Sequence, residues 1–198
     1  EPDRAIGANL LEIAAINDRL VHEPPSTFRE ACQWIAWYQM AARMYNGSGS
    51  LGRLDQLLTP YYERERAAGT LEDEEALFHV ACLLLRDTAY LQLGGPAADG
   101  SDATNRVSFL VLEAAYRLGV PANIAVCVGR NTDPRLLSRG VEIMFAQRKA
   151  MPKFLGIDNW VEGFARNGYP PELARQRAYA GCHWSAIPGR EYTLNDCV

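Results

Sequence analysis

The sequence predicts an α/β fold in which helices form the outside and a few buried strands lie between them. Apolar residues recur at helical spacing through most of the chain. Segment 123–129 has the short apolar run of a buried strand, and segment 152–157 is expected to be a second short strand. Strands that helices cover on both faces have this pattern, so a sheet inside the protein is expected. No repeat or internal domain boundary is visible, which favours a single piece over residues 1–198.

Two helices are expected first, over residues 5–20 and from Phe28 to Met44. Pro24-Pro25 stops the first, because proline cannot continue a helix. Ser26 is the expected N-cap of the second, with Glu30 as its acidic partner. The Gly/Ser-rich run that follows is predicted as a loop whose small residues let the backbone approach a ligand closely.

Three more helices are expected before residue 120. The first covers residues 54–68 and is closed by Gly69, and the next begins near Thr70, passes Leu85 and extends to Leu93 at the furthest. The third covers residues 103–118, with Asp102 as its expected cap and Gly119 as its end.

The last third of the chain alternates between strands and helices. After the strand at 123–129, Asp133-Pro134 begins a helix that reaches Gln147, with proline in its first turn. The second strand, at 152–157, precedes two short helices and a final segment of loop or strand. The short helices are expected over residues 159–166 and 171–178.

Composition excludes several classes of partner. The net charge is −4 and no stripe of Lys and Arg is visible, which argues against nucleic acid, because phosphate binding needs clustered cations. No apolar run reaches the ~18 residues that a membrane span needs. The first residues lack a signal-peptide pattern, and both ends look cut, so a fragment of a longer protein is expected.

The five cysteines favour a reducing cytoplasm. They are odd in number, widely spaced and form no Cys-x-x-Cys pair, so neither a disulfide framework nor a zinc site is expected, and no metal is predicted. Cys32 and Cys82 lie in apolar helical runs and are expected to be core thiols. Cys127 is expected to be a buried strand residue, which leaves Cys182 as the candidate for chemistry.

Cys182 lies in the segment Gly181-Cys182-His183-Trp184, near the end of the chain. Taken alone it has two interpretations. A small residue after glycine is often buried at a tight turn. A neighbouring histidine can instead lower a thiol pKa and produce a nucleophilic thiolate. Adjacent side chains of a strand point to opposite faces, so His183 is weak evidence for the second interpretation.

The segments before Cys182 decide between these interpretations. They are, in order, Thr27-Phe28-Arg29-Glu30-Ala31, Gly52-Arg53-Leu54-Asp55-Gln56 with Pro60-Tyr61-Tyr62, Asp99 to Asn105 with the helix from Ser108 to Ala114, Asn131-Thr132-Asp133, Met151-Pro152 and Gly168-Tyr169. With the cysteine segment they resemble the glycyl radical enzymes of the pyruvate formate-lyase type, over nearly the whole chain. The pattern is most similar to the glycerol and diol dehydratase and related lyase branch.

The resemblance implies a largely helical part of a ten-stranded α/β barrel, with helices outside and few buried strands inside. It implies lyase or dehydratase chemistry on a small organic molecule, in anaerobic metabolism. Cys182 aligns with the cysteine that becomes a thiyl radical. The family's glycyl radical is made by a radical-SAM activating enzyme on a C-terminal segment. No glycine here has the Arg-Val-x-Gly setting of that segment. Relatives are commonly homodimers.

Three departures from the family pattern limit what the resemblance carries over. Formate-lyase itself has two adjacent cysteines, whereas Gly181 and His183 flank Cys182, which disfavours acetyl transfer. The eliminating branches have Cys-x-Glu, with the glutamate as acid or base, and Trp184 occupies that place here. The usual Asn-Gly-His-Ser is replaced by Asn46-Gly47-Ser48-Gly49.

The acid or base must therefore be another residue. His183 is the first candidate, because its ordinary pKa is near the working pH. Asp196 is the second, since without gaps it falls where glycerol dehydratase-like members have a substrate-binding aspartate. Glu191 is the third. Trp184 would add an apolar or stacking wall, which suggests a substrate with an apolar part.

The remaining candidates for substrate contact are polar residues of the two Gly-rich blocks: Asn46, Ser48, Ser50, Asp99 and Ser101. Each has a structural alternative, since such residues also order loops and cap helices. Arg53 and Asp55 are expected to form a structural pair.

Two alternatives to a radical enzyme stay open at this point. The missing glutamate and histidine also suit a catalytically silent homologue or a helical interaction module. The Cys182-His183 pair also suits a non-radical thiol enzyme.

Overall fold

The computed structural model describes residues 2–46, 50–180 and 184–191. Ser48, Cys182, His183 and Asp196 lie outside the described residues. The described residues form, in chain order, α1 (Pro2–Leu20), α2 (Phe28–Asn46), β1 (Ser50–Gly52), α3 (Leu54–Ala68), α4 (Asp73–Arg86), β2 (Tyr90–Leu93), α5 (Arg106–Leu118), β3 (Ile124–Val128), α6 (Pro134–Gln147), β4 (Lys153–Gly156), α7 (Ile157–Arg166), α8 (Pro171–Gln176), β5 (Ala178–Ala180) and β6 (Trp184–Ala186).

A parallel sheet of four strands, in the order β1-β2-β3-β4, organises the molecule. Helices connect each strand to the next, as parallel pairing requires. Gln92, Ala125 and Lys153 lie in one register row across β2, β3 and β4. β5 and β6 form a separate antiparallel hairpin that packs on β2 and β1.

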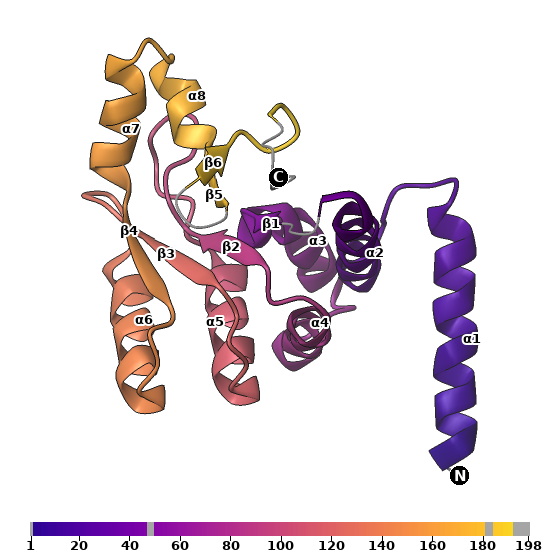
Figure 1. Ribbon diagram of the computed structural model, residues 1–198. Helices are drawn as coiled ribbons and strands as arrows, with labels where there is room; N and C mark the ends of the chain where they lie inside the picture. The colour runs from indigo at the N-terminus through magenta and orange to yellow at the C-terminus, as the bar shows by residue number, and fades with distance from the viewer. Residues whose placement is uncertain (1, 47–49, 181–183, 192–198) are drawn as a thin grey trace.

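The sheet has different neighbours on its two sides (Figure 1). Helices α5 and α6 lie on one side, and α7, α8 and the β5–β6 hairpin lie on the other. α1 stands beside the body and contacts α2. In the described part of the chain, no helix combines the length and apolar character needed to cross a bilayer.

Alternate residues of the central strands face the helical core. Leu91, Leu93, Ile124 and Val126 are 0–3% exposed and belong to one hydrophobic cluster with residues of α2 to α6. Burial of each such side chain stabilises the fold by about 1.5–3 kcal/mol. Their neighbours in sequence, such as Gln92, point to the opposite face, toward the hairpin.

Two predicted helix ends and one predicted strand are confirmed closely. α3 covers the predicted residues, and Gly69 ends it with φ of 69°, a left-handed conformation that favours glycine. Asp133 caps α6 by accepting a hydrogen bond from the Arg135 backbone N–H, with Pro134 in the first turn. β3 matches the predicted buried strand, and Cys127 is fully buried within it.

The expected extension of the fourth helix to Leu93 is wrong. α4 ends at Arg86, Asp87 has extended dihedrals, and Tyr90–Leu93 is strand β2 between β1 and β3. The Gly/Ser-rich loop also contributes a strand, since Ser50–Gly52 pairs with β2 as β1. Both segments are strands because they pair with partners that are distant in sequence.

Three further expectations need correction by a few residues. Thr27, not Ser26, caps α2, because its hydroxyl accepts from the Glu30 backbone N–H. The Glu30 carboxylate in turn accepts from the Thr27 backbone and from the backbone and hydroxyl of Ser26. Asn105, not Asp102, caps α5, in a reciprocal pair with Ser108. The helix expected to reach Ala178 ends at Gln176, because Ala178 pairs with Ala186 in the hairpin.

Candidate functional site

The β5–β6 hairpin flanks the predicted catalytic cysteine in sequence. Its pairs are Ala178 with Ala186, Tyr179 with Ser185, and Ala180 with Trp184. In the sequence, Cys182 and His183 come between the two strands, and both lie outside the described residues. The structure describes the strands on either side of them. Of Trp184 and Asn46, it describes the backbone, in β6 and at the end of α2.

Arg177, directly before β5, joins several parts of the site. It is 6% exposed. Its guanidinium donates to the Ser185 hydroxyl at 2.9 Å and to the Ser185 carbonyl at 2.8 Å. It also lies over the Phe164 ring at 4.2 Å and the Tyr169 ring at 5.1 Å. Such contacts suit a planar, always charged group, so Arg177 connects the hairpin to α7.

Glu191 is the one predicted acid or base whose side chain the structure describes. Its carboxylate accepts a hydrogen bond from Arg177 at 3.0 Å and one from the Ile187 backbone N–H at 3.2 Å. The carboxylate therefore stabilises the segment after β6. Its catalytic role stays a prediction.

Tyr179 attaches β5 to the face of the sheet opposite the core. Its backbone N–H donates to Gln92 Oε1 at 2.9 Å, and its hydroxyl accepts from Lys153 Nζ at 2.9 Å. Its ring meets the Tyr90 ring edge-on, with the centroids 6.1 Å apart. None of these three partners, Gln92, Lys153 and Tyr90, was predicted. The signal for Lys153 was a charged residue inside the second expected strand.

Ser50 lies in β1 and is 3% exposed. Its hydroxyl donates to the Tyr90 carbonyl at 3.0 Å and accepts from the Gly52 backbone N–H at 3.0 Å. These bonds fix the irregular register of β1 against β2. A role in substrate contact remains a prediction for this residue.

A cavity of about 480 Å³ lies beside Ser50, between α2, β1, α3 and the segment after β6. Trp34 and Tyr38 contribute aromatic side chains to its wall. Gln39 Oε1 and Arg53 Nε are buried at the same wall without a hydrogen-bond partner among the described residues.

Asp99 and Ser101 lie in the loop after β2. Asp99 Oδ1 accepts from the Ser101 backbone N–H at 2.9 Å and from its hydroxyl at 2.6 Å, which forms a local turn and lowers the Asp99 pKa. Arg175 of α8 donates to the carbonyl of Ala98 at 3.0 Å. The loop therefore lies against the helix that leads into the hairpin. Contact with substrate remains a prediction for both residues.

Arg53 and Asp55 were expected to form a structural pair; they share no hydrogen bond or ion pair, although the charge of each shifts the pKa of the other. Arg53 donates to the carbonyl of Pro96 at 2.6 Å and to that of Arg175 at 3.2 Å. It therefore joins the end of β1 to the loop after β2 and to helix α8. Asp55 is fully buried and accepts from Gly94 N–H at 2.7 Å and from the Ser108 hydroxyl at 2.6 Å. Burial raises the pKa of Asp55 to about 6, against these hydrogen bonds, which lower it.

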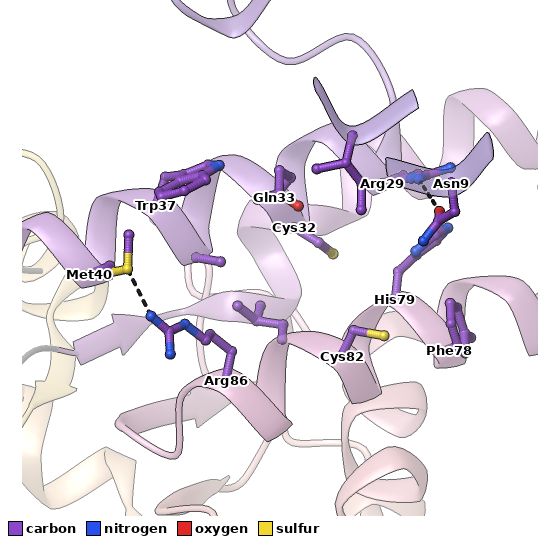
Figure 2. A pocket seen from close by; sticks show the side chains of 13 residues that line it. Asn9, Arg29, Cys32, Gln33, Trp37, Met40, Phe78, His79, Cys82 and Arg86 are labelled. Atoms are coloured by element: carbon purple, nitrogen blue, oxygen red, sulfur yellow. Dashed lines mark hydrogen bonds between the residues drawn. The ribbon is translucent and has the colours of Figure 1, made fainter. Parts of the chain in front are cut away.

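A second cavity, of about 490 Å³, lies between α1, α2 and α4 (Figure 2). None of the predicted site residues lines it. Cys82 does, and its side chain is exposed, so its expected place in the core is wrong: it points from α4 into this cavity. Cys32 is buried as expected, and burial raises its thiol pKa. The described residues contain no cluster of His, Cys, Asp and Glu suited to a metal ion.

Comparison with known proteins adds sequence and structural relatives. The family model described as Pyruvate formate lyase-like matches residues 1–198. The isethionate sulfite-lyase of Desulfovibrio desulfuricans is 26% identical over 96% of this chain and 26% of its own length. The trans-4-hydroxy-L-proline dehydratase of Clostridioides difficile is 27% identical over 96% of this chain and 27% of its own length.

A solved structure on 1,2-propanediol dehydration in Roseburia inulinivorans is also similar. It matches with a TM-score of 0.88 at 26% identity, over 96% of this chain and 26% of that one. The chain therefore spans about a quarter of the length of these relatives.

Proposed function

Because this chain belongs to the pyruvate formate lyase-like family, we propose that it is part of a glycyl radical lyase or dehydratase acting on a small organic substrate. The observation that carries the proposal is the β5–β6 hairpin. Its strands flank Cys182 in sequence and are attached to the sheet through Tyr179 and to α7 through Arg177. Ala178, Tyr179 and Ala186 are 0–6% exposed, which suits a fixed thiol on a dry support.

In the proposed reaction, Cys182 first gives its thiol hydrogen atom to the radical glycine of another segment. The sulfur-centred radical then takes a hydrogen atom from a substrate carbon. When the neighbouring bond has broken, the product radical takes the hydrogen atom back from the thiol. The sulfur-centred radical re-formed in this step then takes a hydrogen atom back from the glycine, which restores both the cysteine thiol and the glycyl radical. The expected partner is a radical-SAM activating enzyme, and the expected setting is a homodimer in an anaerobic cytoplasm.

The acid or base is proposed to be His183, with Asp196 and then Glu191 as alternatives. Trp184 occupies the place of the glutamate of the eliminating branches. The carboxylate of Glu191 is bound to Arg177 at 2.8 Å, which supports its lower rank. Trp184, Ser50, Asp99 and Ser101, with Asn46 and Ser48, are proposed to surround the substrate.

The proposal predicts separate behaviour for radical formation and turnover. Full-length wild type and Cys182→Ser would be incubated anaerobically with an activating enzyme, and their EPR spectra recorded. Both are expected to show a glycyl doublet, because the radical glycine lies elsewhere. Only the wild type should convert a substrate from a panel of isethionate, trans-4-hydroxy-L-proline and 1,2-propanediol, chosen because the relatives are named for them.

Cys82→Ser serves as the matched control, since that thiol lines the cavity between α1, α2 and α4 and should not affect turnover. Turnover by Cys182→Ser would contradict the proposal. A wild type that gives neither a doublet nor turnover would favour the silent homologue. Oxygen-tolerant turnover without a doublet, lost on alkylation of Cys182, would favour a non-radical thiol enzyme.

A further inference from the structure

The contacts of Tyr179 connect β5 to two strands of the sheet at once. Gln92 of β2 binds its backbone, and Lys153 of β4 binds its hydroxyl, each at 2.9 Å. The residue between these partners in the register row is Ala125 of β3. The Tyr179 side chain therefore reaches from β2 toward β4 on this face of the sheet. These two contacts fix the distance of β5 from the sheet and the direction in which the strand runs.

Lys153 is a cation whose partners in this arrangement are aromatic. Its side chain is half-buried, and no carboxylate of the described residues lies within ion-pair distance. Its Nζ lies 5.1 Å from the Tyr90 ring centroid and 5.0 Å from the Tyr179 ring centroid. A cation at this distance is attracted by the electron-rich face of an aromatic ring. Lys153 thus draws Tyr179 and Tyr90 together and directs a hydrogen bond to one of them.

An apolar side chain at residue 153 would pack against the same rings but would give no directional bond. Polar contacts of this type fix one arrangement among several that pack equally well. The strand that they fix is close in sequence to the proposed catalytic cysteine, since Tyr179 lies three residues before Cys182. On the other strand, Ser185 pairs with Tyr179 and is held by Arg177. Both strands beside the cysteine are therefore anchored by directional contacts.

We propose that Lys153 and Tyr179 are positioning residues for the proposed reaction, because they fix strand β5, which comes directly before the Cys182 segment in the sequence. The inference rests on the proposed function, because it concerns the cysteine of that reaction. Hydrogen-atom transfer needs close approach of donor and acceptor, and a displacement of about 1 Å costs roughly 100-fold in rate. Loosening β5 should therefore lower turnover without preventing radical formation.

The test uses the full-length protein with three substitutions. Tyr179→Phe keeps the ring and removes the hydroxyl. Lys153→Met keeps much of the side-chain length and removes the charge. Lys153→Arg keeps a charged donor. Each of the first two should lower kcat by roughly 10- to 100-fold, with an unchanged yield of glycyl radical by EPR and little change in KM. The double variant should be no worse than the stronger single one, because one contact is lost in both. Lys153→Arg should restore part of the rate.

Two controls separate positioning from general destabilisation. Lys149→Met removes another lysine, which donates to the Gly119 carbonyl, and should leave kcat unchanged. Alkylation of Cys182 by iodoacetamide, followed by peptide mass spectrometry in the unactivated protein, reports the thiol directly. Its rate should change in Tyr179→Phe and Lys153→Met and stay unchanged in Lys149→Met.

The outcomes of this test also distinguish the two proposals. Wild-type alkylation and kcat in both variants would overturn the positioning role and leave the radical function standing. A change in alkylation with no radical or turnover in any protein would support positioning while the proposed function fails. If Tyr179→Phe does not fold, the Lys153→Met variant tests the inference by itself. A wild-type kcat and a wild-type alkylation rate in Lys153→Met would then overturn the positioning role.

Discussion

Asp55 shows how a single buried carboxylate is kept in the fold. It lies at the start of α3 and joins β2 to α5, because its oxygens accept from the Gly94 backbone and from Ser108. A charge without solvent is costly even when it is hydrogen-bonded. The pKa of Asp55, raised to about 6, reflects that cost. Its role is structural, since no solvent reaches it.

This raised pKa predicts a pH-dependent stability. The folded state favours neutral Asp55. The contribution of this residue to folding stability is therefore full below pH ~4, its pKa in the unfolded chain, and is lost as the pH rises through about 6. A rise of about two pKa units corresponds to about 3 kcal/mol. Wild type should therefore lose up to about 3 kcal/mol relative to Asp55→Asn between pH 4 and 7. Urea denaturation across this range measures the difference. A difference independent of pH would contradict the assignment.

Helix α6 and strand β4 show how the elements fit together. Gly140 lies on the face of α6 that packs on β4, and a Cβ there would come within 3.1 Å of Phe154 and 3.3 Å of Pro152. Glycine therefore lets the helix approach the edge strand that carries Lys153. Gly163 of α7 has no atom within 4 Å of the same position, so its lack of a side chain serves no contact.

The same substitution at these two glycines should give different results. Gly140→Val should lower the free energy of unfolding by about 1–3 kcal/mol, since the methyl groups overlap Phe154 and Pro152. Gly163→Val should stay within about 0.5 kcal/mol of the wild type, because valine is no worse than glycine in an open helix. Thermal and urea unfolding of the two variants provide the measurement. Equal effects would mean that α6 does not pack on β4 through Gly140.

At the scale of the whole molecule, the predicted α/β class is confirmed, with a parallel sheet, outer helices and a match to a solved structure at a TM-score of 0.88. The expected family is confirmed by the match over residues 1–198. The chain spans about a quarter of its relatives, so most of each relative's length has no counterpart in it. The segments of Arg53 and Asp99 lie together at the helix that leads into the hairpin. Arg175 of this helix accepts a hydrogen bond from Arg53 and donates one to the Ala98 carbonyl.

This partial length leads to a prediction about residues 1–198 alone. Purified as a separate chain and treated with the activating enzyme, they should give no glycyl doublet and no turnover. None of their glycines has the Arg-Val-x-Gly setting expected of the radical glycine. The full-length protein should give the doublet under the same conditions. EPR of the two samples makes the comparison, and a doublet from the separate chain would contradict it.

The sequence alone determined the features that depend on near neighbours in the chain. Helix periodicity, glycine at helix ends and the apolar run of β3 depend on a few neighbouring residues, and they predicted most helices and the strands β3 and β4. The order of motifs around Cys182 indicated the family in the same way. These signals need no knowledge of which distant segments meet.

Only the tertiary structure decided the features that depend on distant contacts. β1 and β2 are strands because they pair with each other and with β3. Cys82 is exposed because α1 and α2 leave a cavity beside α4. Four residues belong to the candidate site only because their partners lie on other elements: Arg177, Gln92, Lys153 and Tyr179. Since a sheet and its hairpin are built from segments far apart in sequence, no local pattern could have shown which of these polar groups meet.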